Sequence, residues 1–169
     1  MTKDRTEASK NLYQRMKPFN NRMVTNYRRG FGPTRITLLL TTTGRKSGLP
    51  RITPLQYEEV DGEFYIASAL GVDADWFKNI YANPNVHVRV QKRDFDAIAE
   101  PVVDAIRIAD FIELRLSRHP IMMRLIMWLF DGLPLHFDRG ELVNFSRGKA
   151  MAVIRPLHDQ PRNPIGVES

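Results

Sequence analysis

The segment Gly44 to Arg51, GRKSGLPR, holds the densest set of chemically useful groups in the chain. Arg45, Lys46 and Arg51 bring three cations, Ser47 brings a hydroxyl, and two glycines allow backbone N–H groups to turn toward a common point. Arginine forks match the oxygens of phosphate or carboxylate groups, and lysine supplies a point charge. The segment is therefore either an anion-binding loop or an exposed turn with scattered positive charge, and composition alone favours neither.

The charge of the chain is uneven. The 169 residues carry a net charge of +6, yet residues 1–51 hold twelve Lys or Arg and only two acidic residues. The first part of the molecule should therefore attract anions, which are a nucleic acid, an anionic membrane surface or an anionic small molecule. The basic residues form no recognised nucleic-acid reader and no aromatic stacking run, so we predict no nucleic-acid partner.

Several chemistries are excluded by residue type. The chain has no cysteine, so disulfides, thiolate catalysis and cysteine-type zinc sites are absent, which is compatible with a cytoplasmic location. The four histidines are isolated and we predict no metal site. His87 alternates with valines and should face solvent from a strand. The polar N-terminus does not resemble a signal peptide.

The elements that must position the loop are mainly strands. β-branched and alternating segments predict about six mainly antiparallel strands, and Asp61-Gly62 is typical of a two-residue hairpin turn. Pro54 indicates a bulge or an edge strand. The fold class is therefore α+β with a barrel-like sheet. The predicted strands cover residues 35–43, 51–60, 63–69, 85–91, 94–102 and 150–154.

Helices should flank this sheet. Residues 1–30 form an amphipathic, basic lead-in, and a short helix over 76–82 has Asp73 or Asp75 as a candidate cap. Two further helices cover 103–118 and 121–130. The second is apolar nearly all round and contains three methionines, so it is either a core helix or a lid or self-association surface. We expect one domain over 1–155 and a loose tail over 156–169.

Two residues outside the basic loop have alternative roles. Ser68 ends a predicted strand, where its hydroxyl can bond either a ligand ring or the local backbone, and the backbone is the commoner partner. Trp76 begins the short helix, where its ring either covers a flat ligand or packs in the core.

Three motifs together resemble a known family. They are LLLTTTGRKSGLPRITP over residues 38–54, the Ile66-Ala67-Ser68 strand end, and the segment from Asp75 to Val86, which follows the pattern DWxxNxxANPxV. Their order and spacing over residues 34–101 are similar to those of the deazaflavin (F-420)-dependent nitroreductases and quinone reductases.

The resemblance implies a split β-barrel similar to the FMN-binding barrels, and coenzyme F-420, a deazaflavin with a phosphate and an acidic tail. It implies that Arg45, Lys46 and Arg51 hold the phosphate and tail, with donors from Ser47 and Gly48. Thr53 and Pro54 would lie beside the ring, Ala67 and Ser68 would touch it, and Trp76 and Asn79 would close the pocket. Hydride would pass from the reduced cofactor to an acceptor, and no catalytic side chain is assigned.

The sequence departs from the family at two places. Family members commonly carry Lys or Arg shortly after the Ala-Ser pair, where this chain has Ala69 and Leu70, and members that reduce nitroaromatics carry tyrosines where residues 117–125 have none. The acceptor is thus open between a quinone and a nitro compound, and a lipophilic quinone suits the methionine-rich helix better.

Three other functions stay open. They are an FMN-binding reductase on the same barrel, a barrel that carries a cofactor, haem or lipid without catalysis, and a basic protein that binds a nucleic acid or a membrane surface. A homodimer and a peripheral membrane contact through the N-terminal helix are further expectations from the resemblance and the charge.

Overall fold

The computed structural model describes residues 24–25, 36–131 and 136–157. Most of the predicted lead-in over residues 1–30 and nearly all of the tail over 156–169 lie outside these ranges. The membrane contact expected of the lead-in therefore also falls on residues that are not described.

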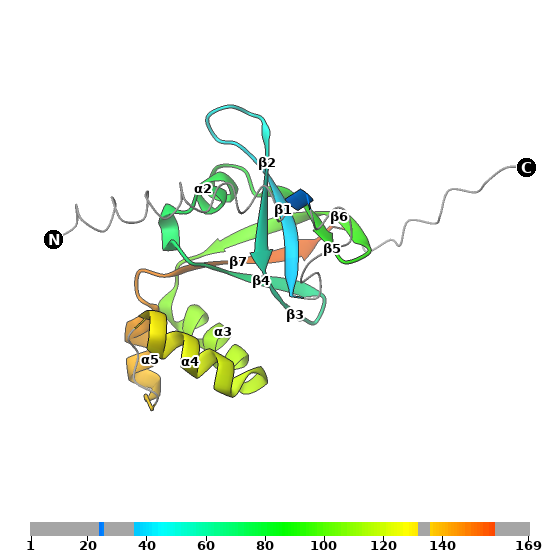
Figure 1. Cartoon of the computed structure of the whole chain (residues 1–169). Coiled ribbons are helices and arrows are strands. Elements are labelled where there is room, and N and C mark those ends of the chain that lie inside the picture. The colour runs from blue at the N-terminus through cyan, green and yellow to red at the C-terminus, as the bar shows by residue number, and fades with distance from the viewer. Residues whose placement is uncertain (1–23, 26–35, 132–135, 158–169) are drawn as a thin grey trace, which may run out of the picture.

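One curled antiparallel sheet dominates the described chain (Figure 1). The strand order is β2-β1-β5-β6-β7-β4-β3, and every neighbouring pair is antiparallel. We call this curled sheet the half-barrel. Its strands are β1 (Thr37–Thr43), β2 (Pro50–Gln56), β3 (Glu58–Val60), β4 (Glu63–Ser68), β5 (Asn85–Val90), β6 (Arg93–Val102) and β7 (Ala150–Pro156).

The prediction of six strands is wrong by one, because the segment 51–60 forms two strands. β2 pairs with β1, whereas β3 pairs with β4 at the other edge of the sheet. Tyr57 lies between them, and its N–H donates to the carbonyl of Ile36 at 3.2 Å. The chain changes pairing partner here without a break in its extended pattern, so periodicity does not reveal the division. Pro54 lies on an edge strand, as predicted.

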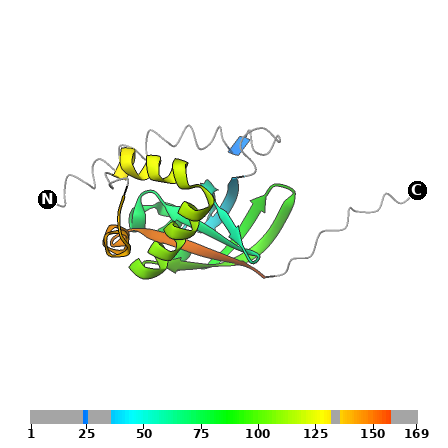
Figure 2. The same cartoon turned by 90° about the horizontal axis from the view of Figure 1, so that it is seen from below.

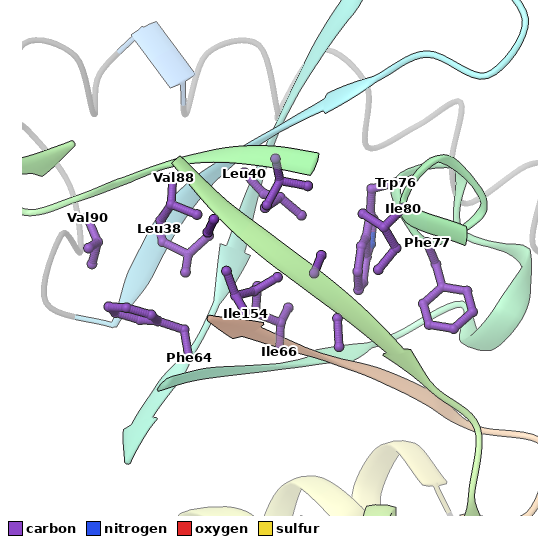
Figure 3. Packing of buried hydrophobic residues seen from close by; sticks show 14 of the residues in the cluster. Leu38, Leu40, Phe64, Ile66, Trp76, Phe77, Ile80, Val88, Val90 and Ile154 are labelled. Carbon is purple, nitrogen blue, oxygen red and sulfur yellow. The ribbon is translucent and has the colours of Figure 1, made fainter. Parts of the chain in front are cut away.

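The concave face of the half-barrel is filled by side chains (Figure 3). Leu38 and Leu40 of β1 meet Phe64 and Ile66 of β4, all with no exposed surface. β5 alternates as predicted, with its valines buried in this core and His87 and Arg89 on the convex face. Buried side chains of the strands therefore form the main core on the concave face.

A short helix adds to this core. Helix α2 (Asp75–Ala82) follows the 3-10 turn η1 (Gly71–Asp73) and contributes Trp76, Phe77 and Ile80 (Figure 3). The predicted cap by Asp73 or Asp75 is wrong. Ala74 is the N-cap and offers no side-chain bond, because Asp75 is already the first helical residue. Packing of the apolar face, rather than capping, holds this helix.

Three helices form a second layer outside the sheet (Figure 2). They are α3 (Ala105–Arg118), α4 (Pro120–Asp131) and α5 (Arg139–Ser146), of which α5 was not predicted. Met123 and Met127 of α4 are buried with side chains of α3, β6 and β7. In the described ranges, no helix has the length and apolarity needed to cross a bilayer.

An ion-pair junction fastens the helical layer to the sheet. The carboxylate of Glu100 on β6 accepts from Arg107 Nη1 of α3 at 2.5 Å and from Arg155 Nη1 of β7 at 2.7 Å. Hydrogen bonds first from Arg107 and then from Arg155 lower the pKa of Glu100 from 4.5 to about 2. A carboxylate held in this way stabilises the folded state only while it is ionised.

We therefore predict that Glu100→Gln lowers stability in a pH-dependent way. Because the folded-state pKa is depressed, the contribution is present above the ordinary value and is lost as pH falls through about 2. The variant should unfold more easily at pH 7, by roughly 1 kcal/mol after allowance for solvent screening. The difference from wild type should disappear near pH 2 in urea titrations. Asp61→Asn in an exposed turn is the control, and an equal loss at both pH values would contradict the prediction.

Candidate functional site

The basic loop between β1 and β2 is a hydrogen-bonded turn rather than an irregular connection. The carbonyl of Gly44 accepts from the N–H of Ser47 at 3.1 Å and of Gly48 at 2.7 Å, and Gly44 N–H donates to Leu49 O at 2.9 Å. A Cβ at position 44 would lie 2.9 Å from Ser47 Oγ and 3.1 Å from Leu49 O. Gly48 has φ of +67°, which L side chains rarely adopt. Both glycines are therefore required by the turn.

Most backbone N–H groups of this loop already form hydrogen bonds. Ser47 Oγ accepts from Leu49 N–H at 3.3 Å, and Arg45 N–H donates to Asn79 Oδ1 at 3.2 Å. Within the described structure, the N–H of Lys46 is the one between Gly44 and Leu49 for which no bond is made. An anion at this loop would therefore be bound mainly by side chains.

Asn79 holds the loop against α2 and β1. Its Nδ2 donates to Thr42 Oγ1 at 3.0 Å, and its Oδ1 accepts from both Arg45 N–H and Arg45 Nη1, the latter at 3.1 Å. The side chain is buried, with 4% of its surface exposed. The resemblance implied that Asn79 would close the pocket, and the structure places its side chain beneath the loop.

Arg45 is already paired with a carboxylate. Its Nη2 lies 3.0 Å from Asp75 Oδ1, and its Nη1 approaches the backbone oxygen of Asp75 at 3.4 Å. Its guanidinium thus crosses from the loop to the start of α2. A neutralised, anchored cation positions the loop more than it attracts a distant anion.

Lys46 and Arg51 are the remaining cations of the loop. Both are exposed, and within the described ranges neither forms an ion pair. Arg51 is paired with Thr42 in the sheet, so the two side chains leave the strands on the same face. These two positive charges, next to a rigid turn, are the groups best placed to meet an anionic ligand.

The other predicted contact residues are divided between the two faces of the half-barrel. Thr53 pairs with Leu40 of the concave face, whereas Pro54 pairs with Leu39 and is buried on the other side. Ala67 is exposed on the convex face, opposite Met151. The structure therefore does not gather these residues on one surface.

Ser68 and Trp76 have structural roles, which were among the alternatives considered for them. Ser68 Oγ donates to Gly71 O at 2.7 Å and is nearly buried. Trp76 lies in the core, with its ring edge-on to that of Phe77 at 5.7 Å between centroids (Figure 3). Neither side chain presents a free surface to a flat ligand in this structure.

A cleft of about 380 Å³ lies beside the loop, on the convex face. Of the predicted site residues, Gly48 lines it. Its other walls were not predicted as site residues, and they are formed by Thr41, Thr42, Thr43, Pro50, Asn85, Val86, His87, Asp96, Ala97 and Leu157. Its volume is at the lower end of the range for small-molecule sites.

Helix α4 does not cover the loop. Figure 1 shows the β1–β2 loop and α4 at opposite ends of the molecule. Ile121 and Leu125 of α4 are exposed, and Met123 and Met127 are buried in the second layer. Of the alternatives for this helix, core packing describes its inward side, and a lid over the basic loop is not observed.

In the described part of the chain, no group of three or more His, Asp or Glu side chains could hold a metal ion.

Comparison with solved structures concerns the fold. The heme storage protein HutZ of Vibrio cholerae is 18% identical, with 73% of this chain and 83% of that chain covered and a TM-score of 0.50. An F-420-H2 dependent reductase is 23% identical over 72% of this chain and 95% of that chain, with a TM-score of 0.49.

Comparison with sequences is more specific. A protein named F-420H(2)-dependent quinone reductase from Mycobacterium tuberculosis is 38% identical over 69 residues, which is 39% of this chain and 46% of the relative. The match thus spans less than half the length of that relative. The family model described as F-420H(2)-dependent quinone reductase matches residues 13–120, which is more than half of the chain and includes the basic loop, α2 and the cleft-lining strands. The chain therefore belongs to the F-420H(2)-dependent quinone reductase family.

Proposed function

We propose that this protein transfers a hydride from reduced coenzyme F-420 to an organic acceptor, a quinone. The observation that carries the proposal is the hydrogen-bonded β1–β2 turn with Lys46 and Arg51 exposed and without an ion pair among the residues that the structure describes. Family membership supports both the cofactor and the acceptor class, and it favours a quinone over a nitro compound.

The cations of the loop divide the work of binding. Lys46 and Arg51 attract the phosphate and acidic tail of the cofactor, and the Lys46 N–H adds a donor. Arg45 is a positioning residue, because its guanidinium already forms an ion pair with Asp75 and a hydrogen bond with Asn79. Ser47 and Gly48 fix the turn. Because they already form hydrogen bonds within the loop, they contribute less to binding of the anion.

When bound, the deazaflavin supplies the hydride chemistry. The protein orients the cofactor by its charged end and excludes water from the reacting faces. The concave face is occupied by core side chains, and the cleft beside the loop lies on the convex face, opposite to the side on which Arg51 leaves β2. The loop therefore supports this proposal more strongly than the other predicted contact residues do, which are Thr53, Pro54, Ala67, Ser68 and Trp76.

The finer features rest on the family resemblance. The half-barrel is one part of a split β-barrel, which a partner subunit or another segment of the chain completes. A homodimer is in keeping with such barrels. The partner is a small, lipophilic acceptor.

Binding of F-420 against FMN and haem tests the function. The alternatives are an FMN-dependent reductase and a non-catalytic carrier, and all use the same basic loop differently. We expect the fluorescence of F-420 to be quenched on binding. We also expect a naphthoquinone to oxidise the reduced form of F-420. Tighter binding of FMN would favour the flavin reductase. Binding of F-420 or haem without oxidation of reduced F-420 would favour the carrier.

We predict that Lys46→Ala combined with Arg51→Ala weakens F-420 binding by about tenfold to a hundredfold. The loss should be larger at low ionic strength, because salt screens exposed charges. Fluorescence titration at two salt concentrations measures it.

The control for this variant removes the same charge elsewhere. Lys92→Ala with Arg147→Ala takes two exposed cations from turns outside the loop. Affinity should change little in the control. Equal affinities in the loop variant and wild type would remove the loop from the proposed cofactor site.

We also predict that Asn79→Ala lowers both stability and affinity, although the side chain is buried away from a ligand. Thr42 and the Arg45 N–H would lose their partner, which should cost roughly 1–3 kcal/mol in the free energy of unfolding. Amide exchange at Arg45 should speed up as the turn detaches from α2. Tyr81→Ala, exposed on the same helix, is the control. Unchanged exchange at Arg45 would show that Asn79 does not hold the loop.

A further inference from the structure

His87 lies between two carboxylates on the convex face. It sits on β5 opposite Asp96 of β6, and Arg89 sits opposite Asp94. His87 Nδ1 is 2.8 Å from Asp96 Oδ1, and His87 Nε2 contacts Asp94 Oδ1. A neutral imidazole can donate from only one of its nitrogens, whereas an imidazolium donates from both. The arrangement therefore suits a protonated ring.

One of the two carboxylates is fixed and the other is not. Arg89 holds Asp94 Oδ2 through Nε at 3.2 Å and Nη2 at 2.8 Å. Burial opposes ionisation of Asp94, but hydrogen bonds from Arg89 and His87 outweigh it, and the pKa of Asp94 is lowered. Asp96 has 77% of its side chain exposed. The result is an Arg89–Asp94–His87 line that orients the ring from one side.

The other side of the ring faces the cleft. His87 and Asp96 line it, and Asp94 does not. Nδ1 is therefore the nitrogen on the cleft side, and its contact with Asp96 is the exposed one. A ligand oxygen can replace the exposed Asp96 contact without disturbing the half-buried Asp94 on the other nitrogen. In histidines that transfer protons, one ring nitrogen commonly bonds a carboxylate and the other is directed to a cleft.

The walls of the cleft indicate the class of ligand. The hydroxyls of Thr41 and Thr43, the imidazole and the apolar surfaces of Pro50 and Leu157 suit a flat, largely apolar molecule with carbonyl oxygens. Asp96 would repel a phosphate or an acidic tail, which belongs instead with Lys46 and Arg51. The charged groups facing His87 are Asp94 and Asp96 of β6 and, through Asp94, Arg89 of its own strand, while β1 presents the uncharged Thr41 opposite it.

We propose that the cleft binds the carbonyl acceptor and that His87 is the catalytic residue that protonates it. This inference rests on the proposed function. The acceptor gains an electron pair and one proton as the hydride from the reduced cofactor, and it becomes an oxyanion. The Nδ1–H bond of the imidazolium breaks, an O–H bond forms, and a hydroquinone leaves. The cofactor, once oxidised, releases one proton to solvent, and the neutral ring takes up one proton from solvent beside Asp96, which restores the starting state.

Carbonyl oxygens could also come from the ring of the cofactor, so the first experiment separates the two sources. Nitrogen-15 NMR of the His87 ring is recorded with 2-hydroxy-1,4-naphthoquinone, whose ionised oxygen mimics the oxyanion, and separately with F-420 alone. We expect the naphthoquinone to shift the Nδ1 signal and to bind at least tenfold more weakly to His87→Gln. A shift with F-420 alone, or none with the naphthoquinone, would overturn the proposal.

The second experiment follows the reaction. In His87→Gln, quinone reduction should fall about a hundredfold while the affinity for F-420 stays unchanged. Lys92→Gln, at the exposed tip of the same hairpin, is the control. An unchanged kcat in His87→Gln would refute the role of His87 while leaving the reductase function intact.

Failure of the proposed function gives a different result. If the wild type oxidises no reduced F-420 with any quinone, that function is wrong, whereas the NMR titration still tests the cleft by itself. Thermal unfolding of each variant shows whether a loss arises from the fold.

Discussion

The carboxamide of Asn79 is the contact on which the arrangement of this protein depends most. One buried side chain joins the end of β1, the backbone of the basic loop and the guanidinium of Arg45. It works because Nδ2 and Oδ1 have opposite hydrogen-bonding characters, so a single group satisfies a hydroxyl on one side and two N–H donors on the other. The loop is thereby held in one position relative to the sheet, and this also fixes the backbone positions of its two outer cations.

Local chemistry made part of the fold predictable. The Asp61-Gly62 turn, the alternation of β5 and the edge position of Pro54 all follow from backbone preferences within a few residues. The exchange of pairing partner after β2 does not, because the sequence is extended on both sides of Tyr57. Helix α5 was missed although Asp138 and Glu141 form a capping box at its start, a signal that the pattern S/T/D-x-x-E carries.

The site was predictable in composition but not in arrangement. The loop cations were identified from residue type and from the family motif, but only tertiary contacts show that Arg45 is neutralised by Asp75. Ser68 and Trp76 were named from the motif, and the structure uses them for the backbone and the core. His87 was placed correctly on the solvent side of its strand, yet its partners come from the facing strand, whose register the sequence does not state.

The two edges of the half-barrel bear on how copies of this chain meet. β3 is three residues long, and β2 carries Pro50 and Pro54, which lack the amide proton that strand pairing requires. Neither border is a good template for adding a strand from a neighbouring molecule. Open-ended polymerisation through the sheet is therefore disfavoured by the covalent structure of the proline rings, before any surface charge is considered.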